Sequence, residues 1–154
     1  KIKNFTLFLR TYLQPDTSLR HSAPVYDLTR QLVKQALDED IGSGDATSLA
    51  LIDPGTMACA TIIARERLTV AGLAVAKMCF SQIDDTTKFE QLTEDGKLLE
   101  AGGLLCRLEG SARVILTGER TALNFLQRLS GIATITAQYQ EADRKSTRLN
   151  SSHW

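Results

Sequence analysis

The feature that most limits how this chain can fold is a helical periodicity that starts at Ser111 and continues to about Ala142. Five apolar residues recur at the i, i+3, i+4, i+7 and i+11 spacing of one helix face: Ala122, Phe125, Leu126, Leu129 and Ala133. Three polar residues follow a different face: Arg120, Asn124 and Gln127. The pattern predicts a long amphipathic helix, with a break expected at Ser130–Gly131.

Shorter elements precede this helix. Ser22 and Pro24 signal the start of a first helix. This helix is expected to end at the segment "DEDIGSGDATS". "TMACATIIARE" alternates as a strand does, with Ile62 and Ala64 on one face, and "KFEQL" predicts another short strand. "GLAVAKMCFSQID" predicts a second helix. "EDGKLLEAGGLLCRLEG" predicts a hairpin of two strands that turns at "EAGG".

The order of these elements is helix, strand, helix, strands and long helix, which predicts the α+β class. Helices on one side of a single sheet leave the other side open. We therefore expect the open face of the sheet to need a partner.

Composition limits the function classes. Eighteen basic and eighteen acidic side chains cancel, so no overall charge favours nucleic acid or an anionic membrane. His21 and His153 are the two histidines, and Cys59, Cys79 and Cys106 form no CxxC pair, which disfavours a zinc site. No apolar run approaches the roughly 20 residues of a membrane-spanning helix. We expect a cytoplasmic protein with reduced thiols, and neither nucleic acid nor a membrane as partner.

The polar stripe of the long helix allows two interpretations. In the first, it is a solvated face and Arg120 pairs with a nearby carboxylate. In the second, Arg120 binds an anionic ligand, because a planar guanidinium can hold a carboxylate with two parallel hydrogen bonds, as lysine cannot. Periodicity fits both interpretations.

Three stretches of the chain together resemble one enzyme family. "LTGERTALNFLQRLSGIAT", "ALDEDIGSGDATSLALI" and "EDGKLLEAGGLLCRLEGSAR" closely resemble quinolinate phosphoribosyltransferase, the decarboxylating enzyme of NAD biosynthesis, from about Val25 to Ala142. The resemblance implies the open-faced α/β sandwich of a type II phosphoribosyltransferase, truncated before its C-terminal α/β barrel. It implies transfer of a phosphoribosyl group from phosphoribosyl pyrophosphate to quinolinate, giving nicotinate mononucleotide, pyrophosphate and carbon dioxide, with Mg²⁺.

The same resemblance assigns one binding residue. Arg120 matches the family arginine that reaches into the neighbouring subunit's site and binds quinolinate, which implies a homodimer or higher homo-oligomer. Glu119 could orient Arg120, although an exposed carboxylate is the simpler interpretation, and Arg113 is expected to pair at the surface or an interface. The family's catalytic groups and Mg²⁺ ligands lie in the barrel, so we expect none here. The acids Glu39, Asp40 and Asp45 are interpreted as structural.

The predicted division of the chain has four parts. Residues 1–23 form an N-terminal arm of uncertain origin, 24–129 the sandwich domain with the "GERTALN" helix, and 130–142 the start of the barrel domain. The basic segment "KIKNFTLFLRTYL" fits a leader remnant, an arm or an artefact. Residues 143–154 are expected to be a disordered tail, because "DRKSTRLNSSH" is what a common sequencing-library adapter encodes in frame. We therefore expect an inactive fragment.

Two alternatives stay open at this point. A sister phosphoribosyltransferase, specific for nicotinate or associated with molybdenum, would share the scaffold. A lipoyl or biotinyl carrier module would share the glycine-turn hairpin, but Lys97 lies beside Gly96 in the wrong half of it and no MKM-like turn is present.

Overall fold

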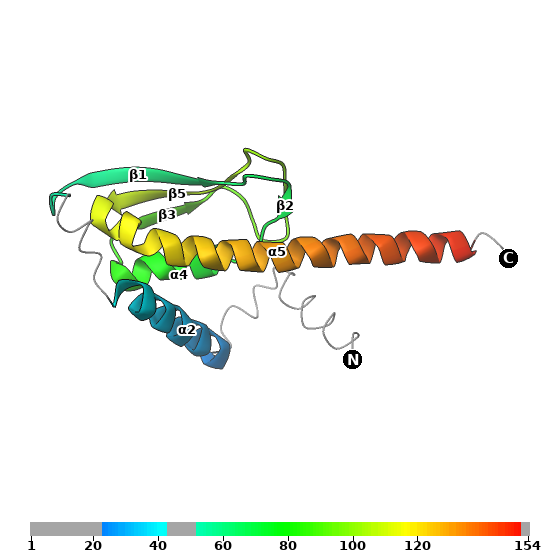
Figure 1. Ribbon diagram of the computed structural model, residues 1–154, viewed down its shortest axis with the longest axis horizontal. Coiled ribbons are helices and arrows are strands. Elements are labelled where there is room, and N and C mark those ends of the chain that lie inside the picture. The colour runs from blue at the N-terminus through cyan, green and yellow to red at the C-terminus, as the bar shows by residue number, and fades with distance from the viewer. Residues whose placement is uncertain (1–22, 43–51, 152–154) are drawn as a thin grey trace.

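The computed structural model describes residues 23–42 and 52–151. The elements, in chain order, are α2 (Ala23–Ile41), β1 (Met57–Ile63), β2 (Leu68–Thr69), α4 (Leu73–Ile83), β3 (Lys88–Gln91), β4 (Leu98–Leu99), β5 (Leu104–Ser111) and α5 (Ala112–Ser151). Figure 1 shows the sheet as one layer, α4 and α5 beneath it, and α2 on the outer side of these helices. The predicted α+β class and the predicted order of elements are confirmed.

The main sheet has the strand order β1-β5-β3, and both pairings are antiparallel. β1 buries its alternate side chains partly and exposes the others. Met57 and Ile63, on the side away from the helices, are 68% and 51% exposed. The open face of the sheet, predicted from the sequence, is therefore present in the structure.

The predicted hairpin is wrong in its strand pairing. The turn at "EAGG" exists, because the Gly103 N–H donates to the Glu100 carbonyl at 3.0 Å. However, β4 pairs with β2 in a separate two-stranded sheet, and β5 lies between β1 and β3. The reason is nonlocal. The Gly102 N–H donates to the Ala64 carbonyl, and the Ala64 N–H donates to the Gly103 carbonyl, both at 2.8 Å. These two bonds direct the chain into the main sheet beside β1.

The core lies between the sheet and the helices. Phe80 of α4 packs on Phe89 of β3 with ring centroids 6.3 Å apart. α5 buries Ala122, Leu126 and Ala133 of the predicted apolar stripe. α2 attaches to the outer side through Val33 and Leu37, whereas three other apolar residues of this helix are exposed: Val25, Leu28 and Leu32. The helices thus share one core, with part of α2 left open to solvent.

The predicted helix break at Ser130–Gly131 is wrong, because α5 runs without interruption through it. Ser130 is buried, and its hydroxyl donates to the Ala71 carbonyl at 3.2 Å and accepts from the Ala71 N–H at 3.1 Å. The Thr134 hydroxyl likewise accepts from the Thr69 N–H at 2.8 Å. These small polar residues dock the helix on the chain around β2 and do not end it.

Where the sequence led us to expect a disordered tail, residues 143–151 continue α5 in the structure, and residues 152–154 lie outside the described part. Figure 1 shows this end of the helix projecting beyond the rest of the molecule. Adding a residue to an existing helix costs far less than nucleating one, so a helix can extend without tertiary contacts. The Lys145–Glu141 ion pair of 2.8 Å, one turn apart, adds local support.

Candidate functional site

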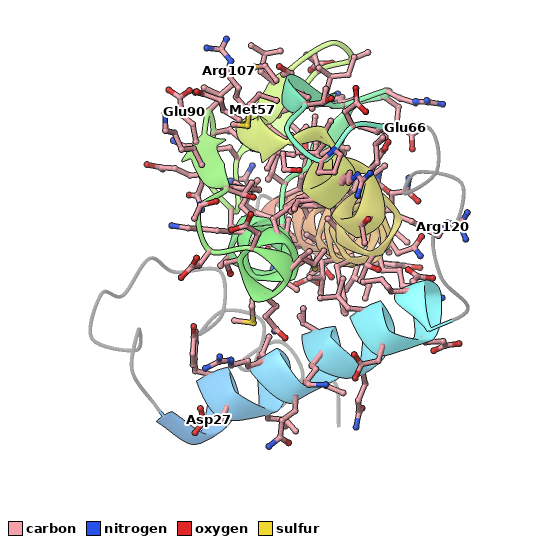
Figure 2. The ribbon with its side chains drawn as sticks, turned by 90° about the vertical axis from the view of Figure 1, so that its left-hand side faces the viewer. Asp27, Met57, Glu66, Glu90, Arg107 and Arg120 are labelled. Atoms are coloured by element: carbon pink, nitrogen blue, oxygen red, sulfur yellow. The ribbon has the colours of Figure 1, made fainter. Side chains whose placement is uncertain are left out.

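Arg120 lies on the exposed side of α5, and the two residues that follow it lie on the buried side. Thr121 and Ala122 are 2% and 0% exposed. Figure 2 shows the Arg120 side chain pointing away from the body of the molecule, on the side where α2 ends. A well-packed helix backbone therefore carries a long cationic side chain into solvent.

Among residues 23–42 and 52–151, the Arg120 guanidinium has no hydrogen-bond or ion-pair partner. The first interpretation of the polar stripe, in which a nearby carboxylate pairs with Arg120, therefore finds no carboxylate in the described part of the chain. Glu119 is exposed and does not bind Arg120. Arg128, farther along α5, is also exposed and has no partner among the described residues. The lack of a partner alone therefore does not show which arginine binds a ligand.

Arg113 differs from the prediction that it pairs at the surface or an interface. Its Nε donates to the Ile52 carbonyl at 2.8 Å, and a terminal nitrogen donates to the same oxygen. Ile52 lies just before β1, so this side chain ties the first turn of α5 to the segment that enters the sheet. Arg113 thus has a structural contact within the chain.

Asp40, at the end of α2, accepts a hydrogen bond of 2.5 Å from the Thr121 hydroxyl. This contact agrees with the structural interpretation of Asp40. Glu39 is exposed, and Asp45 lies outside the described residues. Within the described ranges, no group of three or more His, Cys, Asp or Glu side chains is arranged to hold a metal ion.

The open face of the sheet carries charge and apolar groups side by side. Two ion pairs cross from β3 to β5, Lys88–Glu109 at 3.2 Å and Arg107–Glu90 at 3.9 Å. Figure 2 shows Met57, Glu90 and Arg107 gathered on one side and Arg120 on another, so the open face and Arg120 are separate surfaces. Within each pair the two charges neutralise each other. The open face therefore carries no net charge from these four residues and has exposed apolar groups beside them.

The cysteines offer no reactive thiolate in the core. Burial raises the pKa of Cys79 to about 12 and that of Cys106 to about 11. Cys59 is exposed on the open face, and all three are free thiols. Since the thiolate is the nucleophile, the two buried cysteines are chemically inert at neutral pH.

The carrier-module alternative loses its structural basis. Lys97 is not on the tip of a hairpin between paired strands. Its carbonyl accepts from the Val70 N–H at 2.8 Å, which holds this turn beside β2.

Among the described helices, none combines the length and apolarity that crossing a bilayer requires.

Comparison with known proteins gives one consistent match. Residues 45–130 match the family model described as "Quinolinate phosphoribosyl transferase, N-terminal domain". The chain is 43% identical over 120 residues to a chloroplastic nicotinate-nucleotide pyrophosphorylase [carboxylating] of Oryza sativa subsp. japonica, covering 77% of this chain and 32% of that protein. A probable nicotinate-nucleotide pyrophosphorylase [carboxylating] of Bacillus subtilis (strain 168) is 39% identical over 110 residues, covering 71% and 37%.

Solved structures agree with these matches. The crystal structure of NadC from Streptococcus pyogenes superposes with a TM-score of 0.71 and 41% identity, covering 73% of this chain and 40% of that one. The nicotinate-nucleotide pyrophosphorylase of Francisella tularensis gives a TM-score of 0.69 with 37% identity, covering 73% and 39%. The chain therefore spans about a third of the length of the curated relatives it matches.

Proposed function

We propose an activity from the premise that this chain belongs to the quinolinate phosphoribosyl transferase family, whose N-terminal domain it contains. The named relatives are carboxylating nicotinate-nucleotide pyrophosphorylases of NAD biosynthesis. The proposed reaction joins quinolinate and phosphoribosyl pyrophosphate to give nicotinate mononucleotide, pyrophosphate and carbon dioxide. These names favour quinolinate over the nicotinate-specific and molybdenum-associated alternatives. The chain matches 32% of the first relative, so we propose that it is the N-terminal part of such an enzyme and inactive alone.

Arg120 is the residue that we assign to substrate binding. The match of Arg120 to the family arginine in "GERTALN" carries this assignment, and its free guanidinium on a well-packed turn is the structural observation that supports it. Quinolinate has two adjacent carboxylates, and a hydrogen bond to a charged group contributes about 1.5–3 kcal/mol. An arginine that is already paired within its own chain would have to break that pair before binding. Arg120 has no such pair among the described residues.

The site is shared between subunits in this proposal. Arg120 reaches into the neighbouring subunit's site, so the enzyme is a homodimer or a higher homo-oligomer. The open face of the sheet, with Met57 and Ile63 more than half exposed, supports a protein partner for this domain.

The proposed Mg²⁺ does not fit the described residues, because they contain no cluster of ligating side chains. We place it with the part of the relatives that this chain does not match. When bound, Mg²⁺ would neutralise the negative charge that develops on departing pyrophosphate.

A cytoplasmic location is the remaining part of the proposal. The free cysteines suit a reducing compartment. Plant relatives are named chloroplastic or mitochondrial, so organellar import is the competing outcome. A fluorescent fusion to the complete protein, imaged in the source cells, distinguishes the two: diffuse fluorescence supports the proposal and organellar fluorescence overturns it.

The role of Arg120 can be tested in a chimaera that joins residues 1–134 of this chain to the part of the Bacillus subtilis relative beyond the matched segment. Arg120→Ala should raise the KM for quinolinate by about 10- to 100-fold, which corresponds to one lost charge-assisted hydrogen bond. The KM for phosphoribosyl pyrophosphate should stay within about twofold, since this side chain does not contact the donor. Arg128→Ala is the matched control, because Arg128 is also exposed on α5 without a partner in the described residues.

Equal increases in both Michaelis constants would contradict a carboxylate-binding role for Arg120. So would an equal effect of Arg128→Ala on quinolinate. The proposed inactivity of the chain alone has its own measurement. Pyrophosphate released by the purified chain from quinolinate and phosphoribosyl pyrophosphate would overturn it.

A further inference from the structure

Thr121 uses its hydroxyl differently from three other helical threonines. The hydroxyls of Thr29, Thr134 and Thr136 donate to carbonyls four residues earlier in their own helices, at 2.7–2.8 Å. Thr121 instead donates across to Asp40, the last residue but one of α2. Its bond therefore joins two elements that are 81 positions apart in the chain.

Asp40 occupies a position that α2 alone does not favour. A carboxylate in the last turn of a helix opposes the helix dipole, whose C-terminal end is negative. The last turn of α2 contains no basic residue that could offset this repulsion. The contact to Thr121 gives the carboxylate a partner in another element. A carboxylate that is present against the preference of its own helix indicates a role for the residue that it contacts, Thr121.

The end of α2 is a firm support for this bond. Val33 and Leu37 are buried against the core, at 0% and 4% exposure. The Gln82 side chain of α4 donates to the Arg30 carbonyl at 3.0 Å and holds the middle of the helix as well. The hydrogen bond that Asp40 accepts therefore fixes its donor, Thr121, to the body of the domain.

Thr121 directly follows Arg120, so whatever fixes Thr121 fixes the turn that carries the guanidinium. We propose that Asp40 is a positioning residue for Arg120: through the Thr121 hydroxyl it sets the place of that turn of α5. The proposal rests on the quinolinate-binding role proposed for Arg120. Asp40 itself contacts no substrate.

Loss of the Asp40 acceptor has a defined structural consequence. Thr121 is 2% exposed, so its hydroxyl cannot turn to solvent for a new partner. The nearest acceptor of the usual kind is the carbonyl four residues earlier, that of Thr117. Such a bond within the helix bends it slightly and so displaces the turn that carries Arg120.

The test uses the chimaera defined above with four variants. Thr121→Val removes the hydroxyl and keeps the shape of the side chain, and Asp40→Ala removes the acceptor. Each should raise the KM for quinolinate about tenfold with the donor KM unchanged, because a displacement smaller than about 1 Å should cost less than the roughly hundredfold of a 1 Å misplacement. Asp40→Asn keeps an acceptor oxygen and should stay within twofold of the parent. Asp38→Ala is the matched control, because within residues 23–42 and 52–151 the Asp38 carboxylate pairs with Lys34, at 2.7 Å, and with no other side chain.

A double variant separates positioning from general damage. In the Arg120→Ala background, Thr121→Val should cause no further rise in the KM for quinolinate, because the residue that it positions is gone. Hydrogen exchange of the full 154-residue chain gives a readout that needs no activity. Thr121→Val should speed exchange of the amides near Arg120, whereas Asp38→Ala should not.

The failures can be told apart. If Arg120→Ala raises the KM for quinolinate but Thr121→Val and Asp40→Ala do not, the positioning role is overturned and the substrate-binding role stands. A lower unfolding temperature of Thr121→Val with an unchanged KM has the same meaning, as does an additive effect in the double variant. If Arg120→Ala itself has no effect on quinolinate, the substrate-binding role fails, and the positioning role fails with it.

Discussion

The start of α4 depends on a carboxylate from a distant turn. Gly72, the residue before α4, has a left-handed backbone with φ 101° and no side chain that could cap the helix. A larger residue does not fit there, because an added Cβ would lie 2.6 Å from Leu129 Cδ1 of α5. Asp95 supplies the cap: its Oδ2 accepts from the Gly72 N–H at 3.0 Å and its Oδ1 from the Leu73 N–H at 3.1 Å.

The cost of removing this cap follows from its geometry. Replacing a capping Asp by Ala costs about 0.5–2 kcal/mol of stability. Asp95 satisfies two backbone amides and places a negative charge at the positive end of the helix, which favours the upper half of that range. Because Asp95 is exposed, solvent screens its charge, and we expect the cost to stay below the upper limit of that range. We expect Asp95→Ala to lower the free energy of unfolding by about 1.5 kcal/mol, or the Tm by roughly 3–6 °C.

Thermal and urea unfolding, followed by circular dichroism on the full chain, measure this change. Asp95→Asn keeps one acceptor oxygen and should lose about half as much as Asp95→Ala. Asp85→Ala is the matched control, since Asp85 is an exposed aspartate after α4 whose side chain has no hydrogen bond among the described residues. Its unfolding midpoint should equal that of the parent.

Hydrogen exchange gives the local check. In Asp95→Ala, the amides of Gly72 and Leu73 should exchange faster, because they lose their acceptor. Unfolding midpoints that coincide for Asp95→Ala and Asp85→Ala would refute the assignment of a capping role. Unchanged exchange at the first turn of α4 would do the same.

Three further predictions concern α5 and the thiols. Gly131 is exposed within α5 and an added Cβ would meet nothing within 4 Å, so Gly131→Ala should raise the free energy of unfolding by about 0.5–1 kcal/mol; a urea midpoint that falls would contradict this. A thiol reagent at pH 8 should label Cys59 in the folded chain and reach Cys79 and Cys106 only after unfolding, as peptide mapping by mass spectrometry would record. Because burial raises the pKa of these two thiols from 9.0 to about 12 and about 11, their contribution to stability is fully present below pH 9 and is lost as the pH rises toward 11–12. Urea unfolding at pH 7, 9 and 10.5 checks this, and a midpoint at 10.5 no lower than at 9 would count against it.

Local sequence pattern was sufficient for the parts of the fold that depend on neighbours in the chain. The apolar spacing around Ala122 and Leu126 predicted the buried side of α5, because side chains three and four residues apart share one face of a helix. Alternation in "TMACATII" predicted a strand with one exposed side for the same kind of reason. The exposed position of Arg120 follows directly from that periodicity.

Family resemblance added what periodicity could not give. The string "GERTALN" indicated which of the free arginines to assign to substrate, whereas the structure by itself leaves Arg120 and Arg128 alike in their lack of partners.

Other features depended on contacts between distant parts of the chain, and the tertiary structure alone decided them. A strand pattern does not name its partner, so the pairing of β4 with β2, in place of β5, came from backbone bonds around Ala64 and Gly103. A Ser-Gly pair favours a kink in a helix, but the buried Ser130 hydroxyl bonds to Ala71 and α5 continues through the pair. The same holds for Asp40: sequence marked it as structural, and only packing of α2 on α5 supplied its partner, Thr121. Periodicity specifies which side of an element is buried, and tertiary packing determines what that side meets.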